Sequence, residues 1–199
     1  MADVVIIGAG GHGKVIADII EKCGDCVVGF LDDNPLSDMI LDYPMLGKTE
    51  NCKKYTDKKF IIAIGNNNIR KKIATQYNLD YYTAIHPSAI IGRDVEIGKG
   101  SCVMAGCVIN VSTRIGEHCI INSGSVVEHD NILGNFVHLS PKAALCGTVC
   151  VGDCTHIGAG ATVKNNTSIT QNCVIGVGAA VVGDIINEGT YCGVPAKMM

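Results

Sequence analysis

The stretch TAIHPSAIIGRDVEIGKGSCVMAGCVINVSTRIGEH, residues 83–118, repeats one pattern every six residues. Each block of six carries Ile, Leu or Val at its third place and, in most blocks, a small residue at its first place. Polar residues and Gly gather at the fifth and sixth places. The pattern continues without a gap to Asp184, and the next block ends it with Asn187 at its third place. The repeat therefore forms one uninterrupted unit over residues 83–184.

A period of six residues fits neither an α-helix, which repeats near 3.6, nor a single strand, which repeats near 2. It predicts a triangular β-solenoid, in which each block forms one short strand and one corner, and three blocks close one coil. The aliphatic residue and the small residue two positions before it should point inward. Gly and polar residues should form the corners. Stacked coils would then bury a continuous aliphatic column.

Residues 1–82 follow a different pattern. An apolar segment, Val4–Ile7, precedes GAGGHGK at 8–14, an amphipathic stretch, and a second apolar segment that ends in FLDD at 30–33. A third apolar segment at 60–65 and a helical stretch complete the region. This order predicts a β-turn-α-β unit with one further strand, which is half of a dinucleotide-binding fold.

The turn after the first strand has the features of a phosphate site. Gly8, Gly10 and Gly13 satisfy G-x-G-x-x-G between a strand and a helix, where backbone N–H groups can approach a phosphate. Asp32 and Asp33 end the second strand, where an acid can accept a hydrogen bond from a ribose hydroxyl. Half a fold suits one nucleotide better than NAD. We therefore expect a nucleotide-linked sugar, with a purely structural glycine turn as the alternative.

The composition of the whole chain narrows the class of protein. With 47% hydrophobic residues, 18% charged residues and a net charge of −3, the chain should be globular and gives no sign of nucleic-acid binding. The apolar runs are too short for a membrane span. Eleven cysteines without a secretion signal indicate reduced thiols and a cytoplasmic location. Cys23 and Cys26 form C-x-x-C, but a second ligand pair is missing, so we expect no metal.

The motifs, taken in order, resemble a known family. GAGGHG, FLDD, AIGNNNIRKK, the hexapeptide blocks with VVEHD, and the ending GVPAKMM are similar to the hexapeptide-repeat sugar O- and N-acyltransferases. That family includes the sialic acid O-acetyltransferases and the UDP-4-amino-sugar N-acetyltransferases of the bacillosamine pathway, and IGNNNIRKK favours the amino-sugar branch. The resemblance implies an α/β Rossmann-like half domain at 1–82, which binds the nucleotide sugar. A left-handed parallel β-helix with a C-terminal cap should follow at 83–199.

The same resemblance implies a reaction. Acetyl-CoA would be the cosubstrate, and the acceptor would be the amine of a UDP-linked 4-amino-dideoxy or trideoxy sugar used for bacterial surface glycans. Acetyl transfer needs a general base, a carboxylate that orients it, and a donor to the thioester oxygen. The family's base matches His129 and its orienting acid matches Asp130, with Glu128 as second choice. Many members carry Glu where this chain has Asp130. A solvated corner is the structural alternative for His129.

Further roles follow from the resemblance. The positions expected to bind acetyl-CoA are His138, Gly147, Ala159, Val177 and Lys197. The positions expected to bind the nucleotide sugar are Gly10, His12, Gly13, Asp32, Asp33, Gly65, Asn66 and Arg70. Arg70 would pair with the diphosphate or lie on a solvated helix face. His138 and His156 should stack on adjacent coils, and we expect His86, His118 and His156 at the surface.

The ungapped register has a consequence for assembly. Residues 83–184 leave no room for a long loop that could cover a site on the solenoid. The cover must come from a neighbouring subunit or from residues 1–82, which we call the front region. We therefore expect an obligate homotrimer with sites between subunits. Two alternatives stay open: acetylation of a sugar hydroxyl, as in the sialic acid branch, and a non-catalytic protein that binds nucleotide sugars or serves as a scaffold.

Overall fold

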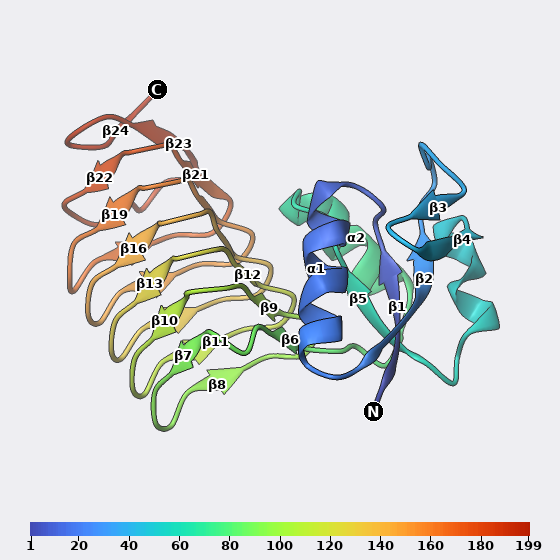
Figure 1. Cartoon of the computed structure of the whole chain (residues 1–199). Helices are drawn as coiled ribbons and strands as arrows, with labels where there is room; N and C mark the ends of the chain where they lie inside the picture. The colour runs from blue at the N-terminus through green and yellow to red at the C-terminus, as the bar shows by residue number, and fades with distance from the viewer.

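The computed structural model describes all residues, 1–199, and shows an α/β region beside a tall solenoid (Figure 1). The α/β region has a five-stranded sheet in the order β3-β4-β2-β1-β5. Its elements are β1 (Asp3–Ile7), α1 (Gly11–Lys22), β2 (Cys26–Leu31), β3 (Met39–Ile40), β4 (Tyr43–Gly47), the 3-10 helix η1 (Thr49–Lys54), β5 (Lys59–Ile62) and α2 (Asn67–Gln76). Strand β1 pairs in parallel with both β2 and β5. The predicted β-turn-α-β unit with one further parallel strand is therefore confirmed.

Two glycines of the turn between β1 and α1 have different surroundings, one closely packed and one open. A Cβ atom at Gly13 would lie 2.2 Å from the carbonyl oxygen of Gly8, so Gly13 lets the helix pack closely against the strand. A Cβ atom at Gly10 would meet nothing within 4 Å, so this part of the turn is open to solvent. Residues on one stripe of α1 are buried against the sheet, which explains the amphipathic pattern of the sequence: Gly13, Ile16, Ala17, Ile19 and Ile20.

The solenoid is built from three sheets, and in its repeating part each short strand pairs in parallel with the strand 18 residues further on, as β10 does with β13. At the C-terminal end β23 pairs in parallel with β21, and β24 pairs antiparallel with β23. We call the three sheets face 1, face 2 and face 3. Face 1 contains β6 (Ala84–Ile85), β9 (Cys102–Val103), β12 (Ile120–Ile121), β15 (His138–Leu139), β18 (His156–Ile157), β21 (Cys173–Ile175), β23 (Gly189–Cys192) and β24 (Lys197–Met198). Face 2 contains β7 (Ile90–Ile91), β10 (Val108–Ile109), β13 (Val126–Val127), β16 (Ala144–Leu145), β19 (Thr162–Val163) and β22 (Ala180–Val181). Face 3 contains β8 (Glu96–Ile97), β11 (Arg114–Ile115), β14 (Ile132–Leu133), β17 (Cys150–Val151) and β20 (Ser168–Ile169).

The interior of the solenoid follows the repeat. Every third-place residue from Val103 to Val181 is buried, and so is every first-place residue from Ser101 to Ala179. At the corners, every sixth-place residue from Asp94 to Gly178 has a positive φ, between 54° and 72°. This left-handed conformation suits Gly and Asn, yet Phe136 adopts it as well. The inward pattern and the corners predicted from the sequence are confirmed.

The α/β region packs against the lower part of face 1. The outward-pointing residues Ala84, Cys102 and Ile120 on β6, β9 and β12 are at most 3% exposed, because α1 and its neighbours cover them (Figure 1). Higher on the same face, His138 is half-buried and Val174 is 43% exposed. Face 1 therefore continues beyond the front region as an open surface.

Arg70 corrects one expectation. It neither faces a diphosphate nor lies on a solvated face, because it is 1% exposed at the junction of the two regions. Its guanidinium donates to backbone carbonyls of both regions, among them His118 at 2.7 Å, Phe136 at 3.0 Å and Ile64 at 2.8 Å. All of its donors are directed to groups of this chain, so Arg70 is a structural tie between the regions.

His118 corrects a second expectation, since it is buried and not at the surface. Its side chain lies between Tyr81, edge-on at a ring distance of 4.4 Å, and Phe136, stacked at 5.2 Å. Burial, followed by the charge of Arg70, lowers the pKa of His118 to about 4. The sequence pattern marks His118 as a corner residue, but this corner is covered by the front region.

No helix in the structure is long and apolar enough to cross a lipid bilayer. The chain also brings together no group of three or more His, Cys, Asp or Glu side chains that could hold a metal ion.

Candidate active site

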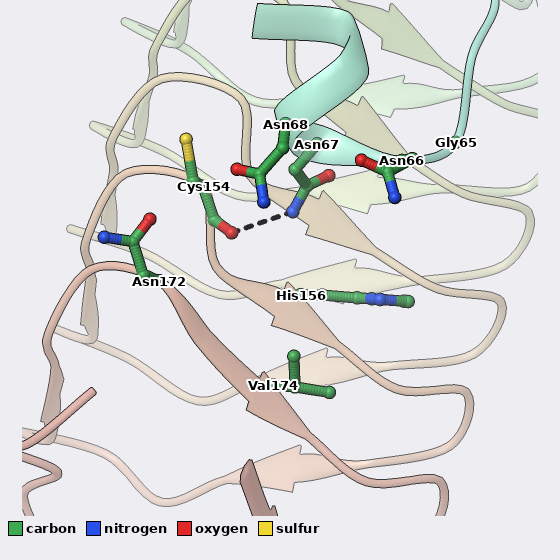
Figure 2. A pocket seen from close by; sticks show the side chains of 8 residues that line it. All are labelled: Gly65, Asn66, Asn67, Asn68, Cys154, His156, Asn172 and Val174. Carbon is green, nitrogen blue, oxygen red and sulfur yellow. Dashed lines mark hydrogen bonds between the residues drawn. The ribbon is translucent and has the colours of Figure 1, made fainter. Parts of the chain in front are cut away.

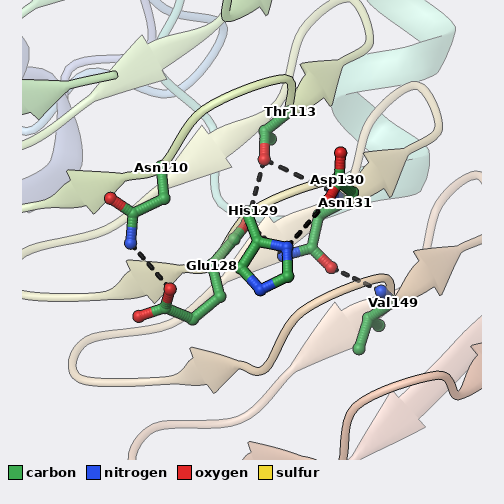
Figure 3. A network of polar contacts seen from close by, with 7 residues as sticks. All are labelled: Asn110, Thr113, Glu128, His129, Asp130, Asn131 and Val149. Carbon is green, nitrogen blue, oxygen red and sulfur yellow. Dashed lines mark hydrogen bonds and ion pairs between the residues drawn. The ribbon is translucent and has the colours of Figure 1, made fainter. Parts of the chain in front are cut away.

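His129 lies on the edge where face 2 turns into face 3. Residues 128–131 connect β13 to β14, and the fifth place of this block puts the His129 side chain outside the solenoid, 54% exposed. Its Nδ1 lies 2.7 Å from Oδ2 of Asp130 (Figure 3). In the tautomer with its proton on Nδ1 this contact is a hydrogen bond to the carboxylate, and Nε2, which has no partner within the chain, is left to act as a base. This is the arrangement of a general base with an orienting acid.

Gly147 lies directly beneath the His129 ring on the following coil. A Cβ atom at Gly147 would lie 2.6 Å from Cε1 and 2.7 Å from Nε2 of His129, so only glycine leaves room for the ring in this position. The N–H of the next residue, Thr148, donates to the carbonyl of His129 at 3.0 Å. The N–H of Gly147 donates to no acceptor within the chain. A free backbone donor therefore lies next to a free imidazole nitrogen.

Glu128 points elsewhere. Its Oε2 accepts a hydrogen bond of 2.7 Å from Nδ2 of Asn110 on the preceding coil, and it forms no hydrogen bond with the His129 ring (Figure 3). Of the two acids beside His129, Asp130 is therefore the one in contact with it. The sequence indicated Glu128 as an alternative because both acids flank the histidine. Only the structure shows that Asn110 holds Glu128 away.

His138 and His156 form a second histidine cluster on face 1. Their rings stack at 4.6 Å with an interplanar angle of 3°, which confirms the predicted stack on adjacent coils. Nδ1 of His138 lies 3.3 Å from the carbonyl of Gly65, and its Nε2 lies 3.3 Å from Nδ2 of Asn122. Burial and the neighbouring His156 lower the pKa of His138 to about 3. His138 is therefore neutral at pH 7 and joins the solenoid to the loop before α2.

A polar hollow of about 180 Å³ lies beside this cluster, between the start of α2 and face 1 (Figure 2). Gly65 and Asn66 line it from the front region, and His156 and Val174 line it from the solenoid. Nδ2 of Asn67 donates to the carbonyl of Cys154 at 2.9 Å and closes one side. Two residues expected to bind the nucleotide sugar, Gly65 and Asn66, are thus brought close to the histidine stack.

The carboxyl ends of β1, β2 and β5 surround a second hollow, of about 390 Å³. Asp32 stabilises the glycine turn there, since its Oδ2 accepts from the N–H of Ala9 at 2.8 Å. Asp33 accepts from the N–H of Thr49 at 2.9 Å through Oδ1 and keeps its other oxygen free. An apolar wall that the sequence did not reveal completes this hollow: Leu31, Ile64, Ile69 and Ile73.

His12 is the second residue of α1 and lies near enough to Arg70 and His138 for their charges to affect its surroundings. Its Nε2 is buried and has no hydrogen-bond partner in the chain. Burial, followed by the charge of Arg70, lowers the pKa of His12 to about 4. His12 is therefore a neutral imidazole whose buried Nε2 has no partner within the chain.

The remaining positions expected to bind the cosubstrate lie on the edge between face 1 and face 2 and in the cap. Ala159 and Val177 occupy fifth places after β18 and β21, and Val177 is 80% exposed. The N–H of Ala159 donates to no acceptor within the chain. Lys197 is exposed on β24. The chain therefore does not bring the edge of His129, between faces 2 and 3, together with the front region, which covers face 1.

Comparison with known proteins fits this geometry. The family model described as the PglD N-terminal domain matches residues 3–77. A GDP-perosamine N-acetyltransferase of Escherichia coli O157:H7 is 29% identical over 98% of this chain and 95% of its own length.

Two solved structures are similar along the whole chain. The acetyltransferase domain of PglB from Neisseria gonorrhoeae FA1090, in complex with acetyl coenzyme A, has a TM-score of 0.95 and 33% identity over 100% of this chain and 99% of that one. PerB from Caulobacter crescentus, in complex with CoA and GDP-perosamine, has a TM-score of 0.93 and 36% identity over 100% and 98%. These likenesses confirm the expected fold, an α/β region followed by a left-handed parallel β-helix.

Proposed function

This chain belongs to the hexapeptide-repeat sugar acyltransferases and is an acyltransferase, and from that premise we propose that it acetylates the amine of a nucleotide-linked 4-amino sugar. The acetyl donor is acetyl-CoA, and the product serves bacterial surface glycans. One observation supports the proposal above the others. At the edge between faces 2 and 3, a base whose Nε2 is free lies over a glycine whose N–H is free.

The chemistry assigns one task to each of these groups. Nε2 of His129 takes the proton of the sugar amine as the nitrogen attacks the thioester carbon. Asp130 holds the ring by its Nδ1–H and stabilises the imidazolium that forms. The N–H of Gly147 donates to the thioester oxygen as negative charge builds there. His129 then returns the proton to the CoA sulfur as the C–S bond breaks, so no acyl-enzyme forms and no cysteine acts as nucleophile.

The front region binds the nucleotide sugar in this proposal. The open turn at Gly10 and the start of α1 receive the diphosphate, with His12 as a neutral partner. The free oxygen of Asp33 accepts a hydrogen bond from the ribose, and the second hollow, with its apolar wall, receives the nucleotide base. The sequence favours UDP, whereas two of the relatives similar over the full length, from Escherichia coli and Caulobacter crescentus, are linked to GDP-perosamine. Both nucleotides therefore belong in the assay.

The proposed active unit is a homotrimer, because the two halves of the site lie on different sides of one chain. His129 lies on the edge opposite face 1, and the front region covers face 1. A neighbour can place its face 1 and front region against this edge. The outward residues of face 2 support contact with another chain, since none is charged: Ile90, Val108, Val126, Ala144, Thr162 and Ala180.

A panel of acceptors tests the function. The chain is incubated with acetyl-CoA, a thiol reagent that detects CoA release, and 4-amino or 4-hydroxy sugars linked to UDP or GDP. Release that depends on the amine is expected. Release with hydroxyl acceptors alone would favour O-acetylation, and binding without release would contradict the proposal.

A further inference from the structure

Asn131 differs from the other residues that point into the solenoid. The first places from Ser101 to Ala179 carry Ser, Thr, Cys, Val or Ala, except that this one carries an amide. Asn131 is 0% exposed, so both ends of its amide need partners inside the protein. It follows Asp130 directly and therefore lies just inside the edge that carries His129.

The amide connects two neighbouring coils. Nδ2 of Asn131 donates to the carbonyl of Glu128 at 2.5 Å, and its Oδ1 accepts from the N–H of Val149 at 2.6 Å (Figure 3). The buried hydroxyl of Thr113 donates to the same Glu128 carbonyl at 2.9 Å. The peptide that joins Glu128 to His129 is thus held from the inside by two donors.

Two other first-place residues show how a corner can be satisfied along the stack, whereas Ser125 donates to the carbonyl of Asn122 at 2.7 Å, three residues earlier, as Asn131 does to Glu128. Thr155 donates its hydroxyl to the carbonyl 15 residues later, at 3.0 Å, and accepts from the N–H 18 residues later, at 3.2 Å. Ser101 makes the same two bonds at 2.9 and 2.8 Å. Asn131 keeps the bond to the N–H 18 residues later but sends its donor back to Glu128 on its own coil. The amide therefore replaces a bond along the stack by a tie to the peptide of His129.

We propose that Asn131 is a positioning residue for acetyl transfer. One end of its amide fixes the peptide that carries His129, and the other end fixes Val149, two residues after Gly147. Asn131 thereby sets the base relative to the free N–H of the following coil. The inference rests on the proposed function, in which these two groups act on the same thioester. Misplacement of a reacting group by about 1 Å can cost about a hundredfold in rate, so a tie of this kind affects turnover.

The variant Asn131→Thr tests the inference without leaving a buried group unpaired. A threonine can repeat the pattern of Thr155, so the N–H of Val149 keeps a partner while the tie to Glu128 is lost. We expect kcat to fall by about tenfold to a hundredfold. The KM for acetyl-CoA and for the amino sugar should stay within about twofold, because Asn131 touches neither, and Tm should stay near that of the parent chain.

Thr155→Ser is the matched control, since Thr155 is a buried first-place residue on the edge between faces 3 and 1. A lower Tm with unchanged kcat in Asn131→Thr, or an equal loss of kcat in Thr155→Ser, would overturn the positioning role. Thr113→Val decides the question if Asn131→Thr does not fold. It removes the other donor to Glu128 and should lower kcat at unchanged KM, whereas unchanged kcat refutes the inference.

The proposed function and the positioning role of Asn131 are contradicted by different results. A parent chain that acetylates no amino sugar contradicts the proposed function. An active parent chain whose Asn131→Thr and Thr113→Val variants are equally active refutes only the role of Asn131.

Discussion

Gly147→Ala gives the most direct steric test of the site. The backbone of Gly147 is not in the left-handed region, so alanine is compatible with its conformation. The added Cβ would lie 2.6 Å from Cε1 of His129, whereas ordinary van der Waals contact begins near 3.4 Å. The ring must therefore move by about 0.8 Å, the difference between these two distances, or tilt away from Asp130.

A displacement of this size should lower kcat by about a hundredfold, which corresponds to about 2.7 kcal/mol of transition-state stabilisation. The His129 side chain is exposed and can move without disturbing the core, so Tm should change little. The assay is CoA release at saturating acetyl-CoA and amino sugar, with Tm measured on the same preparation.

Gly183→Ala is the matched control for this prediction. Gly183 occupies the fifth place two coils further along the same edge, and a Cβ atom there would meet nothing within 4 Å. It should keep the parent kcat. If Gly147→Ala also keeps kcat within about twofold of the control, the position of the His129 ring over Gly147 does not matter for transfer and the reasoning is wrong.

Three further predictions concern the base, the junction and acid stability. His129→Ala should nearly abolish kcat while the oligomer, measured by light scattering, stays intact; unchanged kcat removes His129 from the mechanism. Arg70→Leu leaves several buried carbonyls without donors and should lower the free energy of unfolding by about 3 kcal/mol in urea titrations, and an unchanged value contradicts its role as a tie. Burial lowers the pKa of His118 to about 4, below the value of about 6.5 expected in the unfolded chain. The contribution of neutral His118 to the free energy of unfolding is therefore fully present above pH 6.5 and is lost as the pH falls towards 4. His118→Phe should therefore lose less stability than the parent between pH 7 and 5 in denaturant titrations, and an equal loss in both would show that His118 does not titrate in this way.

Much of the fold could be predicted because the solenoid is specified by a pattern of residues close together in the sequence. Each block specifies which residues point inward, and the 18-residue spacing fixes which strands pair, so periodicity alone leads to the three faces. The contact of His129 with Asp130 is local in the same sense, since the two are adjacent. The stack of His138 on His156 follows from their spacing of one coil.

The remaining features depend on contacts between distant segments. His118 occupies a corner place that is usually exposed, but Tyr81 and the front region cover it. Arg70 lies among polar residues in the sequence, and only the junction shows that backbone carbonyls surround it. The tie through Asn131 had one sequence signal, an amide at a place that otherwise carries small or apolar residues. Its partners became visible only in three dimensions.

The central claim is that His129 of one chain serves a nucleotide sugar held by another, and subunit mixing tests it most directly. His129→Ala lacks the base, and Gly10→Leu should fold, because a Cβ atom there meets nothing, yet block the diphosphate. Each variant alone should be inactive. A sample assembled at random from equal amounts should recover about one quarter of the parent kcat, because about a quarter of all shared sites combine two intact halves. No recovery in proven mixed trimers would place both halves within one chain and contradict the account.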